Sequence, residues 1–141
     1  MPTPMRNHFI IISLALAALF TSCDNGDDLT DIFLSHPWKL ALFNEGGRRT
    51  PGNDNYVMQF YDATFSVSTR SDAVITGYWT ADNKQRTFSC SRVRVENGSI
   101  EGDTIAQKME KILKEARYYE GDTNYLQILV QKNKYMQFHN K

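Results

Sequence analysis

The chain has 141 residues, its 16 Lys and Arg are balanced by 16 Asp and Glu, and 41% of its residues are hydrophobic. This length and balance predict one globular domain with a hydrophobic core and exclude an intrinsically disordered chain. A zero net charge, without a concentrated basic stretch, argues against nucleic acid as a partner.

Residues 1–22 are predicted to be a signal peptide. A short polar stretch that carries Arg6 precedes an apolar run from Phe9 to Phe20, which is the order of the n-region and h-region of an exported protein. The run is too short for a membrane-spanning helix, because a ~30 Å hydrocarbon core takes roughly 20 helical residues.

The apolar run ends in Leu19-Phe20-Thr21-Ser22-Cys23, which resembles the bacterial lipobox. We therefore expect cleavage after Ser22 and attachment of diacylglycerol and a further acyl chain, such as palmitate, to Cys23. The alternative is an ordinary secretory signal followed by an unmodified cysteine. Lipidation would anchor the protein, since each buried CH2 contributes ~0.8 kcal/mol and stable anchoring takes more than one chain.

Residues 23–34 are predicted to form a solvated acidic tether. They hold no basic residue and four carboxylates, those of Asp24, Asp27, Asp28 and Asp31. An acidic cluster behind a lipidated cysteine resembles the signal that sends lipoproteins of the Bacteroidota to the cell surface. The protein is therefore expected on the outer membrane, on the periplasmic side or at the cell surface, and residues 35–141 are expected to form a single domain.

Alternating polar and apolar residues predict strands along most of this domain. Trp38, Leu40 and Leu42 alternate in the first strand, and the glycine- and asparagine-rich segment 44–55 that follows is expected to be a long exposed loop. The other predicted strands span residues 56–61, 64–68, 73–80, 86–95, 118–119, 125–130 and 135–139.

Two features of the predicted sheet indicate local irregularity. Gly77 interrupts its strand and marks a bulge or the close approach of a neighbour. In the next strand the apolar positions change phase between Cys90 and Val93, so we expect a bulge near Ser91.

Residues 104–117 are predicted to form one amphipathic helix. Its apolar side chains recur at helical spacing, at Ile105, Met109, Ile112, Leu113 and Ala116. Thr104 and Gln107 have the spacing of a capping box. Because Asp103-Thr104-Ile105 also resembles the O-glycosylation site of exported Bacteroidota proteins, Thr104 is expected either to cap the helix or to carry a glycan.

About eight strands and one helix before the last strands predict a mainly β fold, a small antiparallel β-barrel. The pattern includes Trp38-Lys39-Leu40, the 60–65 hairpin, Gly77-Tyr78, Thr87-x-x-Cys90, Leu126-x-Ile128 and Met136-x-Phe138. In this order the elements resemble the META-domain family, the fold of HslJ-like heat-shock lipoproteins. A lipocalin-like barrel, which shares the opening tryptophan and the strand count, is the competing architecture.

The residues that usually carry catalysis or bind metals are sparse. Only His36 and His139 follow the predicted signal peptide, and neither has a partner at metal-ligand spacing, so no metal or cofactor is expected. Asn53-Asp54-Asn55 lacks the glycine and closing glutamate of an EF-hand and is expected to be a turn. Without a Gly-x-Ser-x-Gly elbow, a phosphate loop or a dinucleotide fingerprint, an enzyme is not expected. Cys90 is expected to be a buried small hydrophobe rather than a nucleophile.

Two functional classes follow. The META resemblance implies a non-catalytic envelope protein that binds another macromolecule or supports the envelope, with the membrane contacted through the lipid on Cys23. A lipocalin-like carrier would instead hold one small hydrophobic ligand inside the barrel. The side chains expected to line such a cavity are Trp38, Tyr56, Met58, Phe60, Trp79 and Tyr125.

Overall fold

The computed structural model describes residues 29–141; the predicted signal peptide, Cys23 and the first part of the predicted tether lie outside the described residues. The elements in chain order are the π-helical turn η1 (Thr30–Leu34), β1 (Trp38–Glu45), β2 (Arg48–Pro51), β3 (Val57–Phe60), β4 (Thr64–Ser68), β5 (Val74–Asp82), β6 (Thr87–Glu96), α2 (Thr104–Glu115), β7 (Tyr118–Gly121), β8 (Tyr125–Gln131) and β9 (Lys134–His139). None of the helices in this part of the chain is long and apolar enough to cross a membrane.

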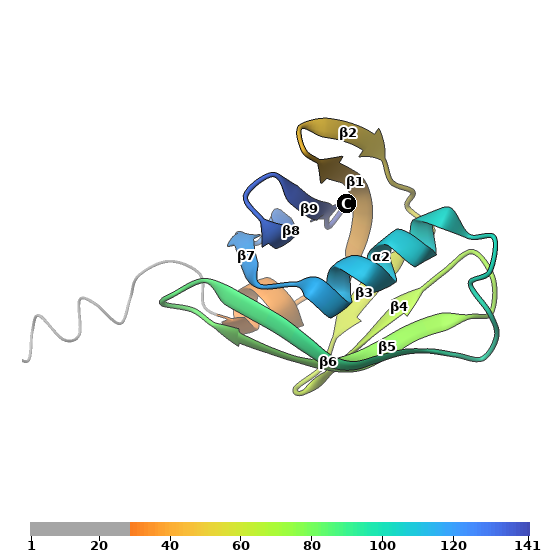
Figure 1. Cartoon of the computed structure of the whole chain (residues 1–141). Helices are drawn as coiled ribbons and strands as arrows, with labels where there is room; N and C mark the ends of the chain where they lie inside the picture. Colours follow the sequence, from red (N-terminus) through yellow and green to blue (C-terminus); the bar gives the residue numbers. More distant parts are fainter. Residues whose placement is uncertain (1–28) are drawn as a thin grey trace, which may run out of the picture.

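The strands form one antiparallel sheet that closes on itself, which confirms the predicted β-barrel class. The nine strands follow the order β2-β1-β3-β4-β5-β6-β7-β8-β9, and β1 also pairs with β9 (Figure 1). The weakest seam lies between β6 and β7, which are joined in register only at Thr87 and Tyr118. Helix α2 packs on β6, β8 and β9, so it covers the barrel where the hydrogen-bonded ladder opens.

The segment 44–55 is not a simple loop as predicted, because it contains β2. Glu45 pairs with Arg48 across a tight turn made by Gly46 and Gly47, whose φ angles are 67° and 92°. Two positive φ angles in succession produce the backbone twist that a two-residue hairpin needs, and glycine adopts them without a steric penalty. The adjacent glycines were therefore a hairpin signal, and the sheet has one strand more than the sequence predicted.

The bulge expected near Ser91 is present, and it explains the glycine in β5. Arg92 and Val93 of β6 stand opposite Gly77 alone, and Arg92 has a φ of 52°. A Cβ atom at Gly77 would lie 2.8 Å from the ring of Phe65 and 3.0 Å from the carbonyl oxygen of Ser91. The extra residue restores the phase of β6, so its apolar side chains on both sides of the bulge pack against the core.

The helix forms where it was predicted, but its N-cap residue differs from the predicted one. Asp103 is the N-cap residue, and its carboxylate accepts a hydrogen bond of 3.0 Å from the backbone N–H of Ala106. Thr104 is instead the first helical residue and is exposed. An aspartate is as good a cap as a threonine and stands one position earlier, so it takes the role predicted for Thr104.

The end of the predicted tether is part of the folded domain. Ile32 and Phe33 in η1 are both 0% exposed, and the indole Nε1 of Trp38 donates a hydrogen bond of 3.0 Å to the carbonyl oxygen of Ile32. Residues 29–34 therefore do not form a solvated tether. The prediction followed the acidic residues of this segment and overlooked Ile32 and Phe33, two large apolar side chains whose burial favours docking on the barrel.

Candidate functional site

The structure brings together five of the six side chains predicted to line a cavity. Trp38, Tyr56, Met58, Phe60 and Trp79 are all buried. Tyr125, the sixth, lies at the start of β8 and is 38% exposed, so it belongs to the outer surface. It was assigned to the cavity because alternation along a strand does not reveal which of the two faces points inward.

The side chain of Phe33 packs against two of the residues predicted to line the cavity, Phe60 and Trp79. Its ring centroid lies 4.9 Å from that of Phe60, 4.8 Å from Trp79, 5.7 Å from Phe88 and 5.0 Å from Tyr119. We call these five residues the aromatic cluster. Aromatic pairs at such separations each contribute about 0.5–1.5 kcal/mol beyond their buried area. The position that a carrier would offer to a ligand is thus occupied by the protein's own N-terminal segment.

The polar groups of the two tryptophans are also engaged. Nε1 of Trp79 donates a hydrogen bond of 2.8 Å to the carbonyl oxygen of Tyr61, and Nε1 of Trp38 donates to Ile32. Neither indole therefore offers its N–H to a ligand. Sequence reasoning missed Phe33, Phe88 and Tyr119 as members of the cluster; the only signal for Phe33 was an apolar pair within an otherwise acidic segment.

Tyr56 has a role different from cavity lining, because it holds the start of α2. Its hydroxyl donates to both carboxylate oxygens of Asp103, at 2.8 and 2.9 Å. The same carboxylate caps the helix at Ala106. Burial, and then the hydrogen bond to Asp103, raise the pKa of Tyr56 from 10.0 to about 12. A β-strand flank and the helix N-terminus are thereby joined through one carboxylate.

We expect Tyr56→Phe to lower the free energy of unfolding by about 1–3 kcal/mol at neutral pH, since a buried hydrogen bond to a charged group is lost. The folded-state pKa lies above the unfolded-state value of 10.0, so this contribution is fully present below pH 10 and is lost as the pH rises through about 12. Urea unfolding of both proteins between pH 8 and 11.5 measures the difference. A difference that stays constant over this range would contradict the assigned contact.

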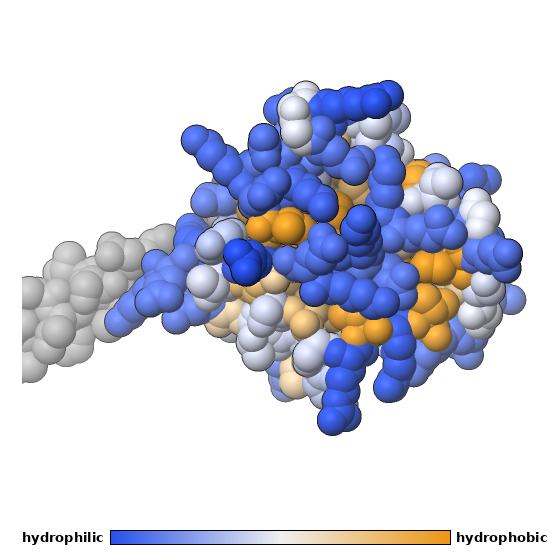
Figure 2. Space-filling model, in the orientation of Figure 1, coloured by the Kyte–Doolittle hydropathy of each residue, from blue (hydrophilic) through white to orange (hydrophobic). Residues whose placement is uncertain are grey.

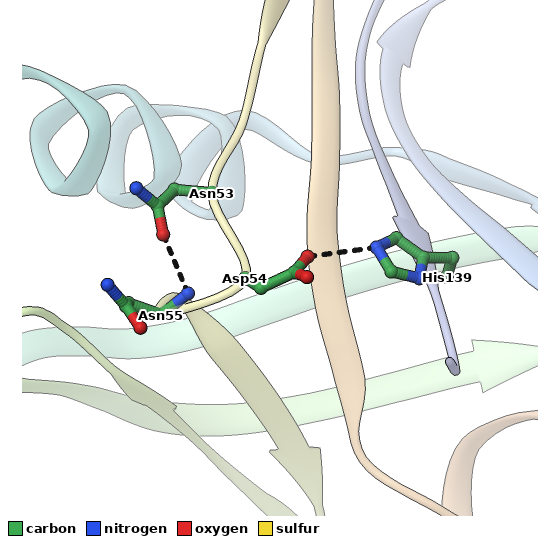
Figure 3. A network of polar contacts seen from close by, with 4 residues as sticks. All are labelled: Asn53, Asp54, Asn55 and His139. Carbon is green, nitrogen blue, oxygen red and sulfur yellow. Dashed lines mark hydrogen bonds and ion pairs between the residues drawn. The ribbon is translucent and has the colours of Figure 1, made fainter.

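The polar turn at Asn53-Asp54-Asn55 is held by one contact within the turn and one to the end of β9 (Figure 3). The side-chain Oδ1 of Asn53 accepts a hydrogen bond of 2.8 Å from the backbone N–H of Asn55, and Oδ1 of Asp54 lies 3.0 Å from Nε2 of His139. The second pair is an ion pair only when His139 is protonated. Within residues 29–141, no group of three or more His, Cys, Asp or Glu side chains is placed to hold a metal ion.

Cys90 is a partly buried residue of β6 that packs against the core. Burial raises the pKa of its thiol to about 12. At neutral pH the side chain is therefore a neutral thiol, which is a poor nucleophile because the thiolate is the reactive form.

The described residues thus define a closed antiparallel barrel, with one helix along its seam and an N-terminal helical turn whose side chains Ile32 and Phe33 are buried in its core. A family profile described as a domain of unknown function (DUF4847) matches residues 24–140. The chain belongs to this family. No curated protein matches it.

A solved structure has the same fold. The crystal structure of a DUF4847 family protein from Bacteroides vulgatus ATCC 8482, at 1.00 Å resolution, superposes with a TM-score of 0.63 and 21% sequence identity. The match covers 81% of this chain and 98% of that chain. At this identity the likeness supports the fold.

Proposed function

We propose that this protein is a lipid-anchored envelope protein of the outer membrane whose barrel is a non-catalytic module that binds a partner or supports the envelope through its outer surface. The observation that carries this proposal is the filled interior, in which Phe33 contacts four other aromatic rings. The META-like reading predicts such a filled barrel. A lipocalin-like carrier would need an open cavity at the same place.

The position of η1 bears on how the barrel would stand on the membrane. Cys23 precedes η1 by only a few residues, and a fully extended chain spans at most about 3.5 Å per residue. A lipid on Cys23 would therefore keep the η1 end of the barrel close to the bilayer. The face that carries α2 shows mostly hydrophilic side chains with separate apolar patches, so it offers no continuous apolar surface (Figure 2).

The anchor is tested by Cys23→Ala in the full chain, expressed in a bacterial host that processes lipoproteins. We expect the unchanged protein in the outer-membrane fraction and the variant in the soluble fraction, because the acyl chains supply the membrane affinity. Cys90→Ala is the matched control, since it removes the only other cysteine, and it should leave the protein in the membrane. Membrane retention of Cys23→Ala would refute the anchor.

The filled core is tested by native mass spectrometry of the mature protein, released gently from the host envelope. We expect a mass equal to polypeptide plus lipid. A further small-molecule mass that is lost in Trp79→Ala would contradict the proposal and support the carrier.

The same mass measurement tests whether Thr104 is glycosylated. A glycan mass that is lost in Thr104→Ala would assign the exposed Thr104 hydroxyl as a modification site.

A further inference from the structure

A groove on the outer face of β7 and β8 has the features of a ligand site. Its volume is about 580 Å³, and it runs from the turn before β6 to the turn after β8. Tyr118 and Tyr125 line it and are 45% and 38% exposed, although tyrosine rings are large and apolar. We call it the tyrosine groove. Exposed aromatic rings beside a few polar groups are typical of sites that recognise small ligands.

Arg86 is held in an unusual conformation at the edge of this groove. Its φ is 57°, a left-handed value that is uncommon for a residue other than glycine. The backbone N–H of Tyr119 donates a hydrogen bond of 3.0 Å to the carbonyl oxygen of Arg86, and the guanidinium lies 5.1 Å from the centroid of the Tyr119 ring. Nη1 of Arg86 is buried without a hydrogen-bond partner among residues 29–141. Because Nη1 is closed off from the groove, the donors left for an anionic ligand are Nε and Nη2, which form no hydrogen bond within the described part of the chain.

The charges of the tyrosine groove favour a ligand with a single negative charge. Arg86 and Lys132 supply two cations and Glu120 one carboxylate, and none of the three forms an ion pair within the described part of the chain. The excess positive charge attracts an anion, and a guanidinium binds a carboxylate through two parallel hydrogen bonds. Glu120 would repel a doubly charged phosphate more strongly than a carboxylate.

The other polar side chains of the groove, Glu120 and Gln127, can accept hydrogen bonds from hydroxyl groups on the same ligand. Glu120 can only accept hydrogen bonds, so it needs donors from the ligand. Gln127 lies opposite Glu120 in the β7–β8 pairing, and its Nε2 already donates 2.9 Å to Oε1 of Gln137, which leaves its carbonyl as a further acceptor. A saccharide supplies hydroxyl donors together with flat C–H faces that pack on tyrosine rings.

We propose that the tyrosine groove binds a saccharide that carries a carboxylate. The carboxylate contacts Arg86 and Lys132, the hydroxyls donate to Glu120 and Gln127, and the sugar rings pack on Tyr118 and Tyr125. This site goes beyond the proposed function, because it names a ligand class and does not depend on the lipid anchor.

The test is isothermal titration calorimetry of the mature protein in detergent micelles with cellobiouronate, a disaccharide with one carboxylate, and with cellobiose as the matched uncharged disaccharide. We expect binding of cellobiouronate that weakens as salt is added, and at least tenfold weaker binding of cellobiose. Tyr118→Ala and Lys132→Gln should each weaken cellobiouronate binding about tenfold. Tyr78→Ala, which removes another exposed tyrosine outside the groove, should leave the affinity unchanged.

Three results would overturn the proposal: no binding of cellobiouronate at millimolar concentration, equal affinity for cellobiose, or equal affinity of Tyr118→Ala and Tyr78→Ala. Lys132 is fully on the surface of a turn, so Lys132→Gln keeps the test decisive if Tyr118→Ala fails to fold. Failure here leaves the membrane location of the protein unaffected, because fractionation measures the anchor separately.

Discussion

Phe33→Ala is expected to lower the free energy of unfolding by about 3–5 kcal/mol, which is the usual cost of truncating a fully buried phenylalanine. The side chain is 0% exposed and forms the centre of the aromatic cluster. Its removal leaves a cavity that β3, β5 and β6 cannot close, because their positions are set by the closed ladder. Urea unfolding followed by the fluorescence of Trp38 and Trp79 measures the loss.

Leu34→Ala is the control for this prediction, because it truncates a neighbour in the same turn that is only partly buried. It should cost clearly less than Phe33→Ala. If Phe33→Ala costs under about 1 kcal/mol, well below the range for buried aromatic residues, then η1 does not dock on the core in solution. The proposed filled interior would then lose its support.

The second large effect is expected at Gly121, the last residue of β7, which pairs with Leu126 of β8. Its φ is 151°, and a Cβ atom there would lie 2.4 Å from the carbonyl oxygen of Tyr125 and 3.0 Å from Cα of Leu126. Both neighbours are backbone atoms, so no side-chain rotation relieves the clash. Gly121→Ala should therefore lower the free energy of unfolding by about 2–4 kcal/mol, from backbone strain and overpacking together.

Gly47→Ala separates these two causes. Gly47 has a φ of 92°, but a Cβ atom there would meet nothing within 4 Å. We expect a loss of about 1 kcal/mol from the left-handed conformation alone. Equal losses in the two variants would show that the close approach at Gly121 is absent. Tyr118 and Tyr125 lie on β7 and β8, the strands on either side of the turn that follows Gly121. Gly121→Ala should therefore also weaken the binding of any ligand in the tyrosine groove.

Much of the fold was predictable because its signals are local. Alternation along a strand reports one buried face, so the strands and the stripe of α2 could be placed. The phase change after Cys90 predicted the bulge, since a bulge is the means by which one strand returns to the same face. The missed strand β2 also had a local signal, the adjacent glycines Gly46 and Gly47. Adjacent glycines are common in exposed loops, but they also form the tight turns of hairpins, which is their role here.

The candidate sites were less predictable, because their members come together only on folding. Tyr125 was placed in the interior and lies outside, while Phe33 was placed in a tether and lies at the centre. The tyrosine groove joins Arg86, Tyr118 and Lys132 from three separate turns and strands, so no spacing along the chain could have predicted it.

Three features could be predicted from the order of residues alone, because each depends on neighbours along the chain. They are the strand pattern, the amphipathic helix and the lipidation of Cys23, which stays a prediction. Three features depend on distant contacts: the closure of β1 against β9, the contact of Tyr56 with the capping residue Asp103, and the burial of Phe33 against Tyr119. An apolar residue must be buried, but its own segment does not specify the surface that buries it. That surface exists only once the barrel has closed.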